Sequence, residues 1–140
     1  MSNQVEVTTE IIFHATEDTK KVLEPLVELF QLEENEFLTE KILGHYGNPI
    51  LLVKNRLTKK RAVKFIDDLV SRIPKAQLND LINNIEMYFE DSSLFLRIGK
   101  NEIVRKEVSM QQTNAIKIKI KIPIYKKDEI VKTYVNLLQS

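Results

Sequence analysis

The sequence predicts an α+β domain built as a two-layer sandwich, with mostly antiparallel strands in one layer and helices in the other. The first observation is segment 115–125, where isoleucines alternate with lysines as in a strand with one buried face. The second is the helical spacing of apolar residues in segments 22–31 and 62–73. The third is a set of short polar turns, such as Gly47-Asn48-Pro49, between neighbouring strand-like segments.

The first half of the chain predicts three strands and one helix. Segment 5–16 alternates as a strand, and Thr16 is the expected N-cap of a helix that runs to Gln31. Pro25 lies inside that helix and should kink or split it. Segments 37–45 and 50–57 then predict two strands that are joined by the glycine-containing turn.

The second half predicts three further helices and three strands. Thr58 is expected to cap a helix that Pro74 ends, and a third helix follows to residue 85. Segments 94–98 and 102–108 predict strands that flank a turn at 99–101. After the strand at 115–125, Asp128 is expected to cap a short final helix.

Length and composition indicate one domain over residues 1–140. The chain has 140 residues, only three glycines, no repeat and no Pro/Gly/Ser-rich linker. It has no cysteine, which excludes disulfides, thiolate metal sites and a cysteine nucleophile. It also lacks a signal peptide and an apolar run of the roughly 20 residues that a membrane span needs. We therefore expect a cytoplasmic protein without a membrane segment.

No enzyme motif is present, so we expect no catalytic residue, no metal and no cofactor. The sequence contains no phosphate-binding glycine loop, nucleophile elbow or HExxH helix. Its two histidines, His14 and His45, are isolated strand residues, which favours a solvent-facing or locally hydrogen-bonded histidine over a catalytic base. Asp67 and Asp68 are adjacent on a helix and point about 100° apart, which favours a solvated face over a metal site.

The net charge of +1 conceals an uneven distribution. Residues 1–40 contain ten acids and two lysines, whereas residues 41–140 contain nineteen Lys/Arg and ten Asp/Glu. Two interpretations remain open. Either a separate basic region attracts an anionic partner, or the two parts of the chain neutralise each other within the fold.

A basic helix start is the first candidate binding site. Lys59, Lys60 and Arg61 follow the expected cap residue, and cations in a first turn oppose the helix dipole. A bound phosphate would compensate for this, since free N–H groups and cations would meet the same anion. The alternative is a solvated charged end or pairing with acids of the first helix. The neighbouring candidates are Lys54, Arg56 and Lys64.

The lysines of the alternating strand are the second candidate site. Lys117, Lys119 and Lys121 share the face opposite the isoleucines, and an exposed basic face can lie along a nucleic-acid backbone. The alternative is an ordinary polar face on which Glu6 and Glu10 pair with these lysines. Tyr46, Tyr125 and Phe95 are candidates for stacking on bases, although such aromatics also serve as core residues.

The segment 44–49 is a candidate binding loop as well as a turn. It concentrates two glycines, a histidine and a proline, and its polar or aromatic candidates are His45, Tyr46 and Asn48. The glycines suit positive φ, which alone explains a turn at this place.

Three segments resemble an archaeal RNA-binding family described as predicted exosome subunits. They are residues 11–18, the hairpin at 44–50 and the closing strand at 118–123, and the resemblance extends in order over nearly the whole chain. It implies a fold like that of ribosomal protein L5, with a mostly antiparallel curved sheet and helices packed on one face. It also implies RNA binding linked to RNA processing or degradation, and it brings no catalytic motif.

Two functions follow as hypotheses. As a non-catalytic RNA-binding accessory factor, the protein would contact phosphates through the basic helix start and the adjacent strand. As an assembly module, it would use the acidic first helix or a sheet edge. RNA is the expected partner. RNA-processing proteins and a second copy of the chain are further candidate partners.

Overall fold

The computed structural model describes residues 4–44, 46–124 and 126–139. Within them, one curved antiparallel sheet of six strands has the order β2-β3-β1-β6-β5-β4. Its strands are β1 Glu6–His14, β2 Leu38–Leu43, β3 Pro49–Thr58, β4 Phe89–Glu90, β5 Ser93–Gly99 and β6 Ala115–Lys121. The predicted α+β fold is confirmed.

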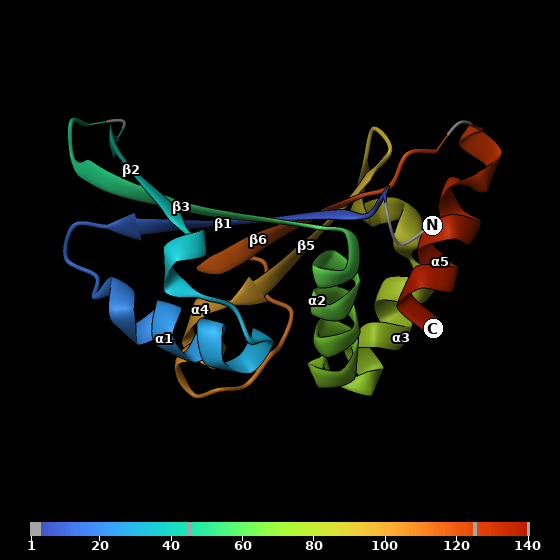
Figure 1. Ribbon diagram of the computed structural model, residues 1–140, viewed down its shortest axis with the longest axis horizontal. Coiled ribbons are helices and arrows are strands. Elements are labelled where there is room, and N and C mark those ends of the chain that lie inside the picture. The colour runs from blue at the N-terminus through green and yellow to red at the C-terminus, as the bar shows by residue number, and fades with distance from the viewer. Residues whose placement is uncertain (1–3, 45, 125, 140) are drawn as a thin grey trace.

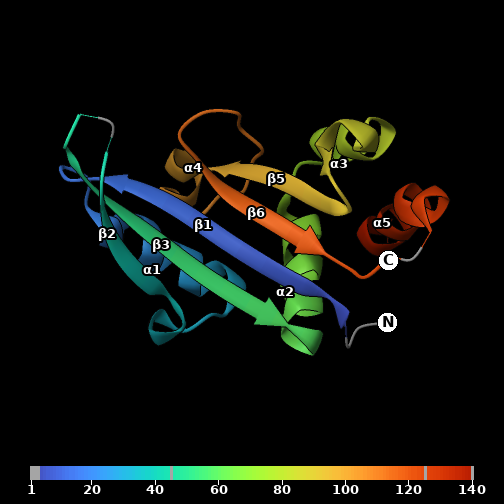
Figure 2. The ribbon, with the colours of Figure 1, turned by 90° about the horizontal axis from the view of Figure 1, so that it is seen from above.

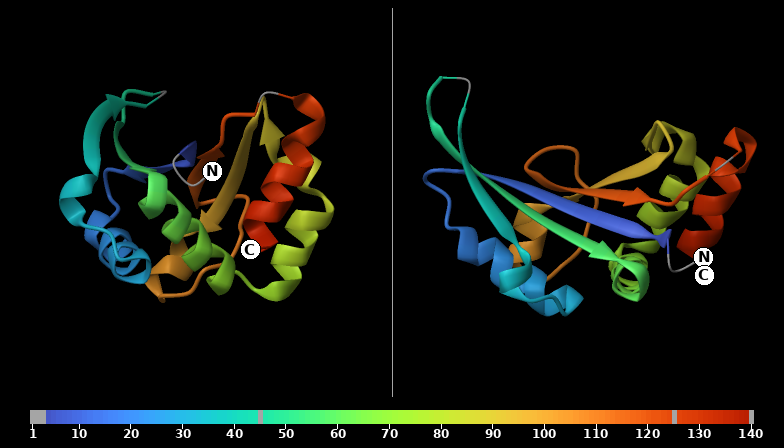
Figure 3. Two further views of the ribbon diagram at one scale, coloured as in Figure 1. Left: turned by 45° about the vertical axis from the view of Figure 1, so that its right-hand side comes forward. Right: turned by 45° about the horizontal axis from the view of Figure 1, so that its top comes forward.

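The helices cover one side of the sheet (Figure 1). They are α1 Thr19–Phe30, α2 Lys59–Arg72, α3 Lys75–Asn83, α4 Lys100–Val104 and α5 Ile130–Gln139, with 3₁₀ turns η2 Glu34–Glu36, η3 Ile85–Tyr88 and η4 Lys127–Glu129. Helix α5 stands beside α3 at one end of the sheet (Figure 3). Seen from the opposite side, the strands β3, β1, β6 and β5 are not covered by any helix (Figure 2).

The core fills the space between the sheet and the helices. On β1, Val7, Ile11 and Phe13 are buried while their neighbours face the other side, which is the predicted alternation. Strand β6 buries its isoleucines in the same way. The apolar stripe of α2 packs onto this layer, with Phe65 fully buried and stacked on Phe30 of α1 at 4.5 Å between ring centroids.

The start of α1 differs from the sequence prediction. The N-cap is Asp18 rather than Thr16, and its side chain accepts a hydrogen bond from the Lys20 N–H at 3.1 Å. Glu17 lies before the helix, where it can reach Lys100 instead of supporting the first turn. Helix α1 continues through Pro25 as one element, so the expected splitting does not occur.

Two other capping predictions were only partly right. Thr58 occupies the N-cap position of α2, but its side chain makes no capping hydrogen bond. The following residue, Lys59, has φ +58° and donates its backbone N–H to the Val5 carbonyl at 3.0 Å. Asp128 lies within η4, immediately before α5, rather than at a simple N-cap.

The predicted strand at 102–108 was wrong. Residues Lys100–Val104 form helix α4, in which Lys100 and Ile103, one turn apart, are the buried positions. The chain then passes through Lys106, with φ +61°, and runs back along the free edge of β5. There, Ile98 forms a bridge with Met110. Tertiary burial of Lys100 and Ile103 therefore outweighs the local strand propensity.

The hairpin between β2 and β3 extends beyond the helices (Figure 1). Gly47 has φ +78°, as predicted for its turn, and the Gly44 N–H donates to the Asn48 carbonyl at 2.6 Å. All six residues of β2 are exposed. No helix in the described part of the chain combines the length and apolar character required to cross a bilayer.

Candidate functional site

The uncovered face of the sheet carries a row of cations, which we call the basic sheet face. It comprises Lys54, Arg56, Arg97, Lys117, Lys119 and Lys121. The strand register aligns them, because Lys117 lies opposite Arg97 of β5 on one side and Glu10 of β1 on the other. Since the helices pack on the other side, this face is open to a ligand as large as a nucleic acid (Figure 2).

The acids of β1 neutralise the cations of β3. Glu6 accepts a hydrogen bond from the Arg56 guanidinium, which raises the pKa of Arg56. Glu10 lies 4.0 Å from the Lys54 ammonium, measured from Oε1 to Nζ. Lys54 and Arg56 are therefore already paired within the protein, and a ligand must compete with these carboxylates.

The lysines of β6 have no such partner. The register places Glu6 opposite Lys121 and Glu10 opposite Lys117, but both acids form their ion pairs with β3. In the described part of the chain, Lys117, Lys119 and Lys121 make no ion pair. The expected alternative, in which the two glutamates neutralise this strand, is therefore not what the structure shows.

Phe95 of β5 lies beside two of these lysines. The Lys117 ammonium is 4.9 Å from the Phe95 ring centroid, and the Lys119 ammonium is 5.7 Å from it. Cation–π contacts hold both side chains near the ring without neutralising their charge. Phe95 is partly exposed on the open face, so aromatic surface and positive charge are presented together.

The basic helix start is only partly available. Both terminal guanidinium nitrogens of Arg61 donate to the Glu36 carboxylate, one of them at 2.8 Å from Nη2 to Oε1. This pairing lowers the pKa of Glu36 and raises that of Arg61. Lys64 pairs with Asp68 at 3.0 Å. Of the four cations predicted here, Lys59 and Lys60 are the two without an ion pair among the described residues.

The structure does not gather all the predicted residues into one site. Helix α2 begins directly where β3 ends, so its start adjoins the basic sheet face but belongs to the helical layer (Figure 1). Two of the loop candidates, Tyr46 and Asn48, lie between β2 and β3 at the tip of the hairpin, at the end of the sheet away from α5 (Figure 1). Tyr46 and Asn48 are exposed there, whereas His45 and Tyr125 lie outside the described residues.

One cation of the basic sheet face was missed in the sequence. Arg97 follows Phe95 by two residues on β5, so the strand alternation that exposes Phe95 also exposes Arg97. Its side chain makes no ion pair or hydrogen bond in the described part of the chain. Applying to segment 94–98 the same alternation that was used for the lysines of β6 would have identified Arg97 as an exposed cation.

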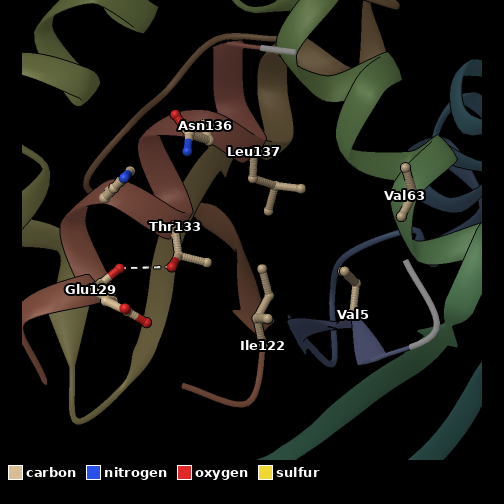
Figure 4. A pocket seen from close by; sticks show the side chains of 8 residues that line it. Val5, Val63, Ile122, Glu129, Thr133, Asn136 and Leu137 are labelled. Carbon is tan, nitrogen blue, oxygen red and sulfur yellow. Dashed lines mark hydrogen bonds between the residues drawn. The ribbon is translucent and has the colours of Figure 1, made fainter. Parts of the chain in front are cut away.

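A separate pocket lies between α2 and α5 (Figure 4). Its cavity is about 460 Å³, and its floor is apolar, with Val5, Val63 and Ile122. Polar groups lie at one side, where the Thr133 hydroxyl donates to the Glu129 carbonyl at 2.7 Å. This lining suits an apolar group rather than a phosphate. No cluster of three potential metal ligands occurs among the described residues.

Comparison with known proteins identifies relatives over most of the chain. A family model described as RNA binding matches residues 6–122. RNA-binding protein PAB1135 of Pyrococcus abyssi is 32% identical over 128 residues, covering 85% of this chain and 83% of that protein.

Solved structures share the fold. Protein AF2318 from Archaeoglobus fulgidus superposes with a TM-score of 0.82 at 28% identity, covering 94% of this chain and 97% of that one. Mth689, a DUF54 protein from Methanothermobacter thermautotrophicus, has a TM-score of 0.74 at 24% identity, with 96% and 98% covered. This second likeness concerns the fold alone.

Proposed function

This chain belongs to the protein family described as RNA binding, and we propose that it contacts the RNA phosphate backbone through its basic sheet face. The observation that supports this choice is the row of β6 lysines, which are on the open face and have no ion-pair partner in the described residues. Free cations on an uncovered surface are the groups that phosphates attract.

The strand geometry suits an extended ligand. Lys117, Lys119 and Lys121 alternate along β6, so strand geometry spaces their Cα atoms by about 6.5–7 Å in a straight row. Each lysine that replaces a counterion on the RNA contributes to affinity in a salt-dependent way. Contacts of this kind position the backbone and carry little base specificity.

The other predicted cations take secondary roles in this proposal. Lys59 and Lys60 adjoin the end of β3 and extend the surface toward α2. Arg61 and Lys64 contribute less, because a phosphate must displace Glu36 or Asp68 from them. Lys54 and Arg56 face the same competition from Glu10 and Glu6.

We place this binding in a non-catalytic role, as an accessory factor in RNA processing or degradation. The resemblance to predicted exosome subunits supports that role, and a cytoplasmic location fits it. RNA-processing proteins are then the expected protein partners. Affinity purification of the tagged chain from its native cells, with and without ribonuclease, tests for them. Recovery of no processing factor in either condition would remove this part of the proposal.

A triple neutral substitution tests the phosphate contacts. In Lys117→Gln/Lys119→Gln/Lys121→Gln, three phosphate contacts are lost, so the slope of log affinity against log salt should shrink by about 2 for single-stranded RNA. The assay is a fluorescence-anisotropy titration of labelled RNA at several salt concentrations, from about 50 to about 200 mM.

The matched control removes the same charge elsewhere. Lys126, Lys127 and Lys132 are exposed near α5, and their triple Gln variant has the same net charge as the test variant. The control should retain most of the affinity and nearly the wild-type slope. Equal losses in both variants would show that only total charge matters, and absence of RNA binding by the wild type would refute the proposal.

The exposed edge strand favours a second candidate function, assembly with a protein or a second copy of the chain. Leu38 and Leu43 of β2 are 75% and 77% exposed, and Ile12 of β1 is half-exposed nearby. The acidic first helix is a weaker candidate, since Glu28 is already paired with Lys106 at 3.0 Å. Sedimentation equilibrium of the wild type and of Leu38→Lys/Leu43→Lys tests this. A wild type that stays monomeric at high concentration would exclude self-association through β2.

A further inference from the structure

A cleft of about 320 Å³ runs along the outer edge of β5, next to the basic sheet face. Its walls are formed by residues 87–90 of η3 and β4, by Phe95 and Arg97 of β5, and by Met110 and Gln112, which are three separate parts of the chain.

The cleft is held in shape by contacts to the sheet and to helices α3 and α5. The Gln111 N–H donates to the Arg97 carbonyl at 3.1 Å, and the Met110 N–H donates to Gln77 Oε1 at 2.8 Å. On the opposite wall, Phe89 pairs with Leu94 and its ring lies 5.4 Å from that of Tyr134, between centroids. Both walls are therefore anchored before any ligand binds.

The lining combines flat apolar surface with hydrogen-bonding groups. Tyr88 and Phe95 supply aromatic rings, and Met87 is exposed at the mouth although it is apolar. Arg97 and Gln112 supply hydrogen-bond donors, and neither side chain has a partner among the described residues. A nucleobase needs this combination, because its faces stack on aromatic or guanidinium planes and its edge is polar.

The position of the cleft indicates a base that is attached to a nucleic-acid strand. Phe95 belongs both to the cleft and to the cluster with Lys117 and Lys119. A nucleotide whose base enters the cleft can therefore place its phosphate against the lysines of β6. A second cleft of about 420 Å³ shares Tyr88, Met110 and Gln112, which leaves room for a neighbouring nucleoside.

From this arrangement we infer that the β5 cleft is a binding pocket for an unpaired base of single-stranded RNA. The inference rests on the proposed function and adds the class of RNA that it selects. Bases inside a duplex are stacked and paired, so a strand, loop or bulge can fill the pocket and a regular helix cannot. The β6 lysines can then contact the phosphates of both single-stranded and duplex RNA, whereas the cleft accepts only single-stranded RNA.

Small ligands test the pocket separately from the phosphate contacts. In a ¹H–¹⁵N NMR titration, we expect the four nucleoside 5′-monophosphates to shift the amide signals of segments 87–90 and 110–112. Ribose 5-phosphate, which has the sugar and phosphate but no base, should leave these signals unchanged. Shifts confined to the β6 strand, or equal shifts with ribose 5-phosphate, would overturn the pocket and leave the phosphate contacts standing.

Binding of RNA by matched variants provides the second test. Phe95→Leu and Tyr88→Leu remove the rings, and each should weaken binding of a ten-nucleotide single strand roughly 5- to 100-fold. Binding of a duplex of the same sequence should change less than twofold. Phe37→Leu, which shortens a partly buried aromatic away from the cleft, is the control, and thermal unfolding verifies that each variant is folded.

The outcomes separate the two proposals. Suppose that both cleft variants bind the single strand as Phe37→Leu does, while the triple lysine variant loses binding. The proposed base pocket is then refuted, and the proposed phosphate binding by the β6 lysines stands. If the cleft variants lose duplex and single-strand binding equally, the proposed selectivity of the cleft for an unpaired base is also refuted. If the wild type binds neither RNA, both proposals fail.

Discussion

Glu17 and Lys100 form an ion pair between segments 83 residues apart, and its removal should destabilise the fold measurably. The Lys100 side chain is only 6% exposed, and its ammonium lies 3.2 Å from Glu17 Oε2. It also donates a hydrogen bond to the Ile12 carbonyl and lies 4.9 Å from the Phe13 ring centroid. The pair therefore joins α4 to the end of β1 beneath the sheet.

The substitution Glu17→Gln leaves the buried ammonium without its carboxylate. Breaking a fully buried pair costs about 3–5 kcal/mol. Here the Glu17 side chain is 30% exposed and Lys100 keeps its bond to Ile12. We therefore expect a loss of about 1–2 kcal/mol in the free energy of unfolding, or a fall of roughly 3–7 °C in Tm. Urea unfolding followed by circular dichroism measures it.

The effect should depend on pH in a defined direction. Burial acts to raise the pKa of Glu17, but the His14 N–H and the Lys100 ammonium together hold that pKa below its ordinary value. A carboxylate with a lowered pKa stabilises the fold above its unfolded pKa, and this contribution is lost as pH falls through the folded pKa. The stability difference between wild type and Glu17→Gln should therefore shrink between about pH 7 and about pH 3.

Glu24→Gln is the control, because Glu24 is exposed on α1 and has no ion-pair partner in the described residues. The reasoning is refuted if the two variants are equally stable at neutral pH. It is also refuted if the deficit of Glu17→Gln persists undiminished in acid.

Three further substitutions test other parts of the fold. Thr9→Val should raise the free energy of unfolding by about 1 kcal/mol in urea titrations, since the buried Thr9 hydroxyl has no hydrogen-bond partner and valine has nearly its shape. A decrease would indicate a partner for that hydroxyl. Tyr134→Phe should lower the free energy of unfolding by about 1–2 kcal/mol, because the buried hydroxyl donates to the Ser92 carbonyl at 2.7 Å. Burial raises the pKa of Tyr134, so the wild type should also lose stability above about pH 10, where the unfolded tyrosine ionises first, and the Phe variant should lack this loss. Arg61→Gln should cost less than about 1 kcal/mol, because Arg61 is half-exposed and surface pairs contribute little; a larger loss would mean that its pair with Glu36 holds α2 in place.

Local patterns predicted the elements whose burial follows a simple period. The alternation in segment 115–121 correctly assigned isoleucines to the core and lysines to the other face, since successive strand residues point to opposite sides. The prediction failed at 102–108, where burial of Lys100 and Ile103 forms a helix. Nothing in that segment indicates that Glu17, far away in the sequence, supplies the partner for Lys100.

The candidate site likewise has one part that the sequence predicted and one part that only the structure revealed. The sequence named the lysines of β6, but the cleft beside β5 joins Tyr88, Phe95 and Gln112 from segments with no common period. Such a site forms only when the chain after α4 returns along the edge of β5.

By itself, the sequence determined which side chains of the regularly patterned strands and helices face the core, because strand and helix periods are local properties of the backbone. The sequence also showed that residues 1–40 are acidic and residues 41–140 basic, but it did not show which acids pair with which cations. Only the tertiary structure decided that Glu6 pairs with Arg56 and Glu10 with Lys54, which leaves the β6 lysines available. The physical reason is that an ion pair requires a few ångströms of separation, and the sheet register, rather than distance along the chain, sets which acid reaches which cation.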